Sequence, residues 1–406
     1  MRVVVVDEAL PVPTDTGKRI RTFELLRRAA RAHEVVLVVP EEAPPDPAHL
    51  ATVREAGLEV VRVPRRPLRK HGWRFARDLA RNLLLPVPYM VMAHRLRAVR
   101  AAVAALLAQR PADLVHVEWT PLVANVPADA GVPVVVSAHN VEADLWARQV
   151  QAQPTRARRA YAALQHRKVA RFERRALAQA DGVVAVSEPD AERIRTWTGQ
   201  PRVRVVRNGV DTATFVPRPG AAAGSRELLF LGSLDWRPNQ DAVTWFLETT
   251  WARVRAAVPD ATLRVVGRAP PDALAARWRA APATAVDGSV PDVRPFLARA
   301  AVVVVPLRVG GGSRLKICEA LATGRPVVST TVGAEGLDVG DGVVRADDPE
   351  AFAAAVVEAL TRPDEAAVRA ARGRERVLVH HAWDAEAPRL VAAWREVVEA
   401  GPRRRP

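Results

Sequence analysis

The sequence predicts two α/β domains, each built on a doubly wound parallel sheet. Apolar, β-branched runs of strand length recur along the 406 residues, and stretches of helical length separate them. Strands that are apolar without alternation are typical of parallel sheets covered by helices on both faces. The pattern begins a second time after residue 226, and the chain is long enough for two domains.

The first half alternates strands with helices. We expect strands at residues 3–6, 35–39, 114–118, 133–137 and 182–186. Helices are expected at residues 18–32, 90–109 and 156–180. Parallel neighbours need crossovers of this length between them, so the order itself favours a parallel sheet.

The second half repeats this order, with strands expected at residues 227–232, 262–267, 301–306 and 326–330. Asn208-Gly209 is a turn signal, and the Pro/Ala/Gly stretch behind it indicates a linker. The expected domains are residues 1–208, residues 209–384, and a final helix at 385–406 that packs back on the N-terminal domain. Ligands of doubly wound sheets bind beyond the carboxyl ends of the strands, so we expect the site in a cleft between the two domains.

Charge and cysteine content narrow the function classes. The net charge is +15, and the basic residues are almost all arginines scattered through every segment. The sequence has no zinc-ligand spacing, RNP-like strand or compact basic helix-turn-helix, so nucleic acid is not the expected partner. An acidic small ligand or an anionic membrane surface fits the excess better. The single cysteine, Cys318, and the lack of a spanning apolar stretch indicate a cytoplasmic protein, with peripheral contact at the inner membrane face as a further expectation.

The segment 308–330 predicts an anion site. Its turn and helix cap are formed by Gly310, Gly311, Gly312 and Ser313. A helix is expected at residues 314–323, which puts Arg314 and Lys316 at the positive pole of the helix dipole, where cations are disfavoured. A phosphate or diphosphate bound by the loop and the helix N-terminus would reverse that effect. Glu319 is suited to accept hydrogen bonds from a ribose diol. The alternative interpretation is a solvated Lys316–Glu319 pair on a structural helix.

The same stretch carries a resemblance to a known family. "GGGSRLKICEALATGRPVVSTTVGAEGL", preceded by "LLFLGSLDWRPNQDAVTWF" and "LRVVGR", is similar to the donor-binding domain of family 4 glycosyltransferases of the GT-B fold. "PVPTDTGKRIRTFELLRRAARAHEVVLV", "SAHNVEADLW", "VVAVSEPDAERI" and "VRNGVD" resemble that family's first domain and interdomain region, in the right order. The resemblance implies transfer of a sugar from a nucleotide-sugar donor, usually with retention of configuration.

Carried over by position, Glu319 matches the second glutamate of the family's paired-glutamate motif, which holds the ribose. The first glutamate falls at Gly311 and is absent. The family's arginine after the first strand of this domain is Ser233 here, and its lysine is replaced by Asn239. The resemblance therefore implies that the diphosphate is neutralised by Arg314 and Lys316, with Arg237 as an additional candidate. Leu315 and the loop amides complete the expected donor site.

In the first domain, Gly17 resembles the family's glycine in the first strand–helix loop, and His139 its histidine beside the donor sugar. An ordinary turn glycine and a structural histidine are the alternative interpretations. Glu142, His116 and Glu118 are weaker candidates for loop or supporting residues. No Asp-x-Asp pair occurs in the sequence and no Cys/His spacing suits zinc, so we expect neither a metal nor another cofactor.

The resemblance implies a retaining glycosyltransferase, and the missing Asp-x-Asp pair predicts that it works without a metal. The expected donor is a UDP-, GDP- or dTDP-sugar, and the acceptor a glycan, a lipid-linked glycan or a small molecule. Arg314, Lys316 and His139 are the expected catalytic residues. The alternatives are a nucleotide-sugar epimerase or hydrolase of the same fold, and a non-catalytic binder of anionic polymer.

A basic amphipathic helix is expected within residues 64–86. Its apolar stripe contains Trp73, Ala76, Leu79 and Leu83. Its flanking cations are Arg66, Arg69, Lys70, Arg74, Arg77 and Arg81. Such helices lie on anionic lipid, which is the basis of the expected membrane contact. The alternative interpretation is a domain helix with a solvated basic face.

Overall fold

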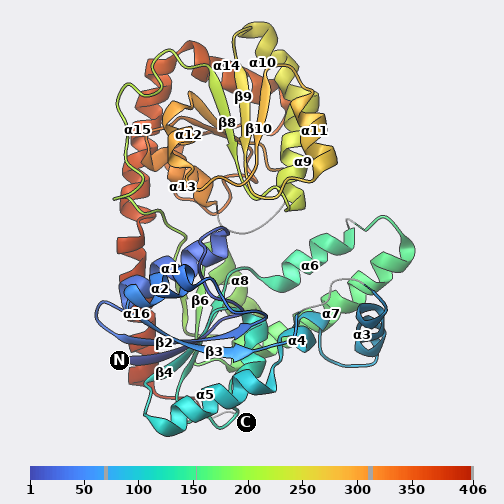
Figure 1. The fold of residues 1–406 in the computed structure, drawn as a ribbon, viewed down its shortest axis with the longest axis vertical. Coiled ribbons are helices and arrows are strands. Elements are labelled where there is room, and N and C mark those ends of the chain that lie inside the picture. Colours follow the sequence, from blue (N-terminus) through green and yellow to red (C-terminus); the bar gives the residue numbers. More distant parts are fainter. Residues whose placement is uncertain (68–71, 152, 310–313, 404–406) are drawn as a thin grey trace. The chain divides into compact units, whose positions relative to one another are not determined.

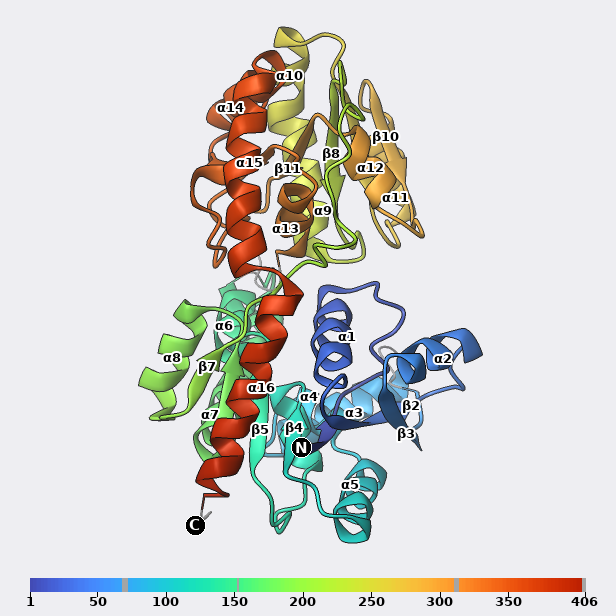
Figure 2. The same ribbon diagram turned by 90° about the vertical axis from the view of Figure 1, so that its left-hand side faces the viewer.

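The structure is a computed structural model that describes residues 1–67, 72–151, 153–309 and 314–403. The chain divides into two compact units. Unit 1 contains Met1–Arg207 and Ala387–Pro406, and unit 2 contains Asn208–Glu386. Each unit is one parallel sheet with helices on both faces (Figure 1 and Figure 2). The predicted class, two doubly wound parallel-sheet domains, is confirmed.

Unit 1 has the strand order β3-β2-β1-β4-β5-β6-β7. The strands are β1 (Arg2–Val6), β2 (Glu34–Glu41), β3 (Leu58–Pro64), β4 (Leu114–Val117), β5 (Val134–Ala138), β6 (Gly182–Ala185) and β7 (Val203–Val205). Every residue of β1, β4, β5 and β6 is buried. This burial explains why these strands are apolar without alternation.

The helices of unit 1 include two that carry site residues, α1 (Gly17–Ala29) and α6 (Glu142–Gln151). The others are α2 (Pro47–Glu55), α3 (Trp73–Leu83), α4 (Tyr89–His94), α5 (Arg97–Gln109), the 3₁₀ turn η1 (Thr120–Asn125), α7 (Arg156–Gln179) and α8 (Glu188–Thr198). The helix α16 (Trp383–Ala400) begins in unit 2 and belongs to unit 1 from Ala387 onward.

Unit 2 has the strand order β10-β9-β8-β11-β12-β13. The strands are β8 (Glu227–Leu231), β9 (Thr262–Val266), β10 (Thr284–Asp287), β11 (Val302–Val305), β12 (Val327–Ser329) and β13 (Val343–Arg345). The helices are α9 (Arg237–Trp245), the π-helical turn η2 (Phe246–Thr250), α10 (Trp251–Ala257), α11 (Asp272–Arg279), α12 (Arg294–Arg299), α13 (Leu315–Ala322), the 3₁₀ turn η3 (Gly340–Gly342), α14 (Pro349–Thr361) and α15 (Pro363–His380).

Two features depart from the sequence expectations. The helix expected at residues 90–109 is divided into α4 and α5, because the side chain of Asn125 accepts a hydrogen bond from the Leu96 amide and donates one to the His94 carbonyl. The strands β3, β7, β10 and β13 were not expected. All four are edge strands, and their polar residues shorten the apolar run.

Candidate active site

Both sheets have a switch point at which the strand order reverses, between β1 and β4 in unit 1 and between β8 and β11 in unit 2. The carboxyl ends of strands at such a point are where doubly wound folds bind ligands. In unit 2, Gly232 and Ser233 follow β8, and the helix α13 comes after β11. In unit 1, Glu118 follows β4 and His139 follows β5. The sequence-predicted residues therefore gather at the expected edge of each sheet.

The helix of the predicted anion site, α13, begins at Leu315, with Arg314 in the N-cap position and Leu315 buried. Gly310, Gly311, Gly312 and Ser313 lie outside the described residues. The expected start at residue 314 is thus one residue early. Lys316 is the second residue of α13, and Gly324, with φ of 73°, follows its C-terminal end.

The Lys316 amine lies over the carboxyl end of β8. It donates a hydrogen bond to Oδ1 of Asn239, 3.1 Å away, and is 4.6 Å from the centre of the Phe230 ring. A methyl group added at Gly232 would lie 2.7 Å from this amine and 2.7 Å from Nδ2 of Asn239, so these side chains would have to shift. Burial, with repulsion from Arg314, lowers the pKa of Lys316 to about 7, although Glu319 raises it in part.

Asn239 is the residue that holds this lysine, and sequence reasoning treated it only as a missing cation. Its amide nitrogen donates to the carbonyl of Ser233 over 2.8 Å, which fixes the side-chain oxygen toward Lys316. Ser233 contributes its backbone here. Arg237 is exposed as the first residue of α9.

Arg314 is buried and turns away from the solvent. Its guanidinium donates to the carbonyl of Val332 over 2.8 Å and forms an ion pair with Glu335 at 3.8 Å. These contacts tie the N-terminus of α13 to the segment after β12. Arg314 therefore positions the helix that carries Lys316, in addition to placing a second positive charge near it.

Glu319 lies one turn after Lys316 on α13 and is half-buried. Burial raises the pKa of its carboxyl to about 7, against the attraction of Lys316. Among the residues that the structure describes, Lys316 and Glu319 form no ion pair with each other or with a third residue. The solvated pair of the alternative interpretation is thus not what these side chains form.

Lys18 in unit 1 makes an informative comparison, because it too is the second residue of a helix that follows a strand end. Its amine is paired with Asp7 at 2.6 Å and with Glu8 at 2.8 Å. Burial alone lowers the pKa of Lys18, but the two carboxylates raise it above its usual range. Two carboxylates of unit 1 thus form ion pairs with Lys18, whereas no carboxylate in the described part of unit 2 forms one with Lys316.

His139 and the weaker candidates of unit 1 form one buried polar network. Nε2 of His139 lies 3.0 Å from Oε2 of Glu118, and Nε2 of His116 lies 3.2 Å from its Oε1. Burial opposes ionisation, but the hydrogen bonds from the two histidines hold the pKa of Glu118 well below its usual range. Trp394 of α16 donates to Nδ1 of His116 over 3.1 Å. Sequence reasoning missed Trp394, because no local pattern marks a contact across 278 residues.

The remaining candidates lie near this network. Gly17 is the first residue of α1, which Thr16 caps through a hydrogen bond from the Arg19 amide. Glu142 accepts a hydrogen bond from the Trp119 indole over 2.9 Å at the start of α6. The described residues contain no group of three or more histidine, cysteine, aspartate or glutamate side chains placed to hold a metal ion.

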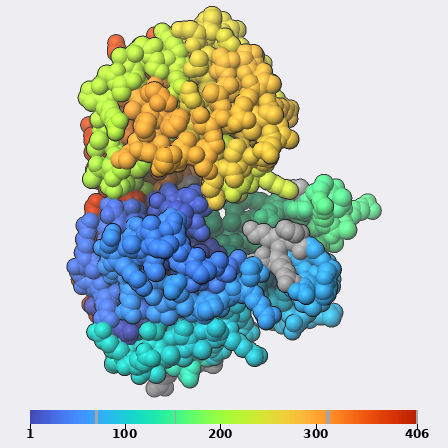
Figure 3. Space-filling model, in the orientation of Figure 1, coloured from blue at the N-terminus to red at the C-terminus, as the bar shows by residue number. Residues whose placement is uncertain are grey.

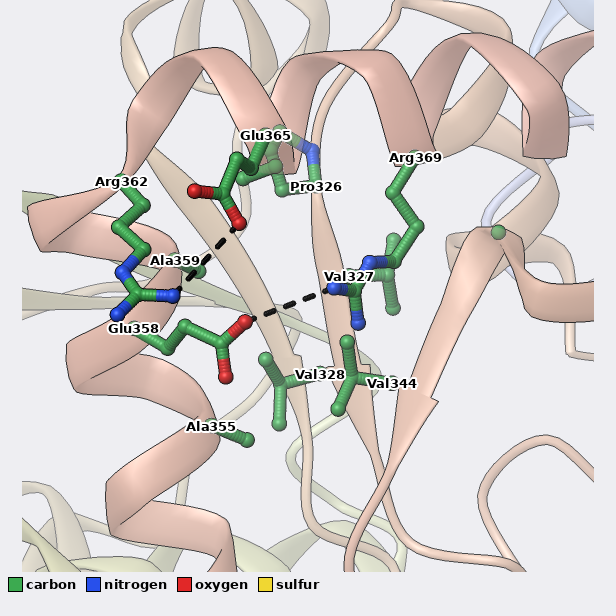
Figure 4. Close-up of a pocket in the computed structure, with 12 residues that line it drawn as sticks. Pro326, Val327, Val328, Val344, Ala355, Glu358, Ala359, Arg362, Glu365 and Arg369 are labelled. Atoms are coloured by element: carbon green, nitrogen blue, oxygen red, sulfur yellow. Dashed lines mark ion pairs between the residues drawn. The ribbon is translucent and has the colours of Figure 1, made fainter.

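A separate pocket lies on another part of unit 2, between β12 and β13 and the helices α14 and α15 (Figure 4). Glu358 and Arg369 form an ion pair at 3.6 Å there, and Arg362 and Glu365 form one at 3.8 Å. None of the sequence-predicted site residues lines this pocket. The charged side chains of this pocket are paired with each other. We therefore place the candidate active site at the strand ends and not in this pocket.

We predict that Lys316→Met stabilises the folded protein. Below about pH 7 the amine is charged in both states, and the folded state bears the full cost of burying it; between about pH 7 and 10.5 the folded state loses the proton first, so wild-type stability rises with pH. The gain from the methionine, about 1–2 kcal/mol near pH 6, should therefore shrink toward pH 10. Unfolding midpoints in urea at several pH values measure it.

The matched control is Lys18→Met, which makes the same change at the same helix position. It should destabilise, because Asp7 and Glu8 lose their partner. A loss of stability in Lys316→Met at pH 6 would show that its amine has a counter-charge after all.

Several solved structures have a fold similar to that of this chain. Sucrose-phosphate synthase from Thermosynechococcus elongatus aligns with a TM-score of 0.71 at 19% identity, over 98% of this chain and 100% of that one. Anabaena HepE in complex with UDP and glucose aligns with a TM-score of 0.66 at 12% identity, over 97% and 98%. WaaG, a glycosyltransferase involved in lipopolysaccharide biosynthesis, aligns with 0.63 at 20% identity, over 96% and 98%.

Family comparisons cover most of both units. Residues 83–214 match Glycosyltransferase Family 4, and residues 225–362 match Glycosyl transferases group 1. No curated protein sequence matches the chain. The predicted family and enzyme class are confirmed by the two matches and the parallel-sheet architecture: the chain is a glycosyltransferase of family 4 with the GT-B fold.

Proposed function

We propose that the enzyme transfers a sugar from a nucleoside-diphosphate sugar and that Lys316 neutralises the departing diphosphate. The observation that carries this proposal is a half-buried lysine at a helix N-terminus, without a carboxylate partner in the described residues and with its pKa lowered to about 7. An anion at this place satisfies both the amine and the helix dipole. HepE has a similar fold, and its solved structures include complexes with UDP and with UDP-glucose.

The proposed chemistry retains the configuration of the sugar. The bond between the anomeric carbon and the phosphate oxygen breaks while a bond to the acceptor oxygen forms on the same face, and the phosphate oxygen takes the acceptor's proton. Negative charge grows on the diphosphate during this step, so Lys316, the Arg314 charge and the α13 amides stabilise the transition state more than the ground state. The proposal assigns this neutralisation to the protein without a metal ion, and a chelator should leave turnover unchanged.

Glu319 has the complementary role of holding the nucleotide. A carboxylate with a pKa near 7 becomes ionised when a ribose diol donates hydrogen bonds to it. The acceptor in this proposal is a hydroxyl of a glycan, a lipid-linked glycan or a small molecule. The buried, unpaired Cys318 suits a reducing compartment, and we propose a cytoplasmic location.

The kinetic prediction concerns Lys316→Ala. Turnover should fall about 100-fold, roughly 3 kcal/mol, while the dissociation constant of the donor changes less, because the contact strengthens in the transition state. Gly232→Ala should give a similar loss, since its methyl group would displace the amine. Gly288→Ala is the control, because an added methyl group there meets nothing. Steady-state kinetics measure all three, and wild-type turnover in Lys316→Ala contradicts the proposal.

A second prediction concerns proton linkage. Binding of a nucleoside diphosphate raises the pKa of Lys316, so its share of the affinity is complete below pH 7 and is lost as pH rises through the pKa of the complex. Binding lowers the pKa of Glu319 and releases a proton. Near pH 7, Glu319→Gln should therefore take up protons on binding UDP or GDP, and Lys316→Met should release them. Calorimetry in buffers of different ionisation enthalpy separates the two, and the same sign in both variants contradicts these roles.

We also propose that α3 lies on an anionic lipid surface. No helix in the described part of the chain is long and apolar enough to cross a membrane, but α3 lies at the surface of unit 1 (Figure 3). Trp73 is 69% exposed and Leu84, directly after the helix, 88%. Leu79, expected on this stripe, is half-buried, and the exposed apolar face contains Ala76, Ala80 and Leu83 as well.

Charge complementarity favours lipid as the partner of this face. Arg74 and Arg77 lie 5.3 and 5.5 Å from the Trp73 ring, and Arg81 is exposed one turn further along. Arginines beside an exposed tryptophan match the phosphate level of a bilayer, where the indole is also favoured. Arg69 and Lys70, expected to contribute, lie outside the described residues.

Flotation with vesicles tests this contact. Binding to vesicles with anionic lipid should be strong at low salt and absent for neutral vesicles. Arg77→Gln and Arg81→Gln should each weaken it about 5-fold, roughly 1 kcal/mol per charge. Trp73→Ser should weaken it too, whereas Val368→Ser, at another exposed apolar site, on α15, should not. Equal binding to both vesicle types, or none, contradicts the contact.

A further inference from the structure

The solvent-exposed face of α7 carries a line of arginines, which we name the α7 stripe. It consists of Arg156, Arg167, Arg171 and Arg174. We propose that the α7 stripe is a docking surface for an acidic glycan, a chain with carboxylate or phosphate groups on successive sugars. The choice of a glycan rests on the proposed function, in which a glycan is one of the acceptors, whereas the preference for a polyanion follows from the helix alone.

Helical spacing brings the four arginines onto one face of α7. Arg167 follows Arg156 by 11 residues, which is about three turns. Arg171 and Arg174 then follow at intervals of four and three residues, the spacings of neighbours on one helix face. All four side chains are exposed. With a rise of 1.5 Å per residue the stripe is about 27 Å long, which suits a linear ligand better than a compact one.

Other faces of α7 are held by neighbouring helices of unit 1. Lys168 donates to the carbonyl of Asn82 over 2.6 Å, at the C-terminal end of α3. Glu173 accepts hydrogen bonds from the amides of Glu142 and Ala143 over 2.9 and 2.8 Å, at the start of α6. The helices α3 and α6 thus flank α7 (Figure 1). These contacts fix the helix before any ligand arrives, so binding does not have to order it.

The α7 stripe has no carboxylate partner among the described residues. The helix contains one acidic residue, Glu173, which is buried, and residues 145–172 contain no aspartate or glutamate at all. Arginines on other exposed helices are paired, as Arg372 of α15 is with Asp341 at 2.6 Å. The stripe is therefore more than the general arginine content of the chain, since its charges are left without local compensation.

This arrangement is unfavourable for the helix itself. Arg167 and Arg171 are four residues apart, and Arg171 and Arg174 are three apart, distances at which like charges destabilise a helix. Arg156 is the first residue of α7 and lies at the positive pole of the helix dipole. A negatively charged chain along the stripe would turn each of these repulsions into an attraction.

The remaining side chains of α7 favour a glycan over other polyanions. A guanidinium binds carboxylate or phosphate through paired hydrogen bonds, which suits an acidic sugar. The aromatic residues of the helix, Tyr161 and Phe172, are half-buried, so α7 lacks the exposed stacking platform of single-stranded nucleic-acid sites. None of the large exposed apolar side chains in the described residues lies on α7, so this helix, unlike α3, has nothing to insert into a bilayer.

Titration of the full chain with a long oligogalacturonate tests the docking surface. Binding should be measurable at low salt, should weaken as salt is added, and should be absent for the galacturonate monomer and for a neutral galactan of equal length. The double variant Arg167→Gln/Arg171→Gln should bind about 10-fold more weakly. The matched control, Arg372→Gln/Arg376→Gln on α15, removes the same charge outside the stripe and should keep the wild-type affinity. Circular dichroism checks that both variants fold.

Other outcomes overturn the proposal. No binding at low salt, or an equal loss in the two double variants, shows that the stripe is an ordinary solvated surface. A larger loss for single-stranded DNA than for the glycan assigns the stripe to nucleic acid. A loss of flotation with anionic vesicles like that expected for Arg77→Gln assigns it to lipid. No sugar donor is present in these titrations, so a chain that transfers no sugar would refute the proposed function without changing this result.

Discussion

A parallel sheet covered by helices on both faces leaves one place for polar chemistry, the edge where its strands end. The strands β1, β4 and β5 are buried along their whole length, so none of their side chains is open to a ligand on the sheet faces. Polar residues are therefore concentrated beyond the strand ends. Glu118 and His139 directly follow strands, and Lys18 and Lys316 lie in the first turn of a helix, whereas His116 is an exception inside β4.

The two units use this edge in opposite ways. In unit 1 the charged residues at this edge are paired: Lys18 has Asp7 and Glu8, and Glu118 has two histidines. In unit 2, Arg314 forms an ion pair with Glu335, but no carboxylate among the described residues forms one with Lys316. Paired charges suit recognition of a neutral group by hydrogen bonds, and an amine without an ion pair suits an anion.

Much of the fold and part of the site could be predicted from the sequence. Apolar runs and their spacing predicted the parallel sheets. The positive charge of Lys316 at the start of a helix predicted an anion site there. The sequence did not reveal the roles of Asn239, Trp394 and the carboxylates that pair with Lys18. These roles depend on contacts between segments that are distant in the sequence. Arg314 was expected as the first residue of the helix but lies in its N-cap position. Its hydrogen bond to Val332 could not be predicted, because it depends on how the segment after β12 returns to the helix. The break between α4 and α5 depends likewise on Asn125 from another element.

The helix α16 places Trp394 in unit 1, although the ribosome makes it after all of unit 2. During synthesis, residues 1–207 leave the ribosome before Trp394, whose indole contacts His116, has been made. The segment that completes unit 1 follows about 180 residues later in the chain. A nascent or truncated chain that ends after Arg345 but before Trp394 contains every described strand of both sheets but lacks one end of the histidine network. Unit 1 can therefore complete its histidine network only after α16, the last helix of the chain, has been synthesised.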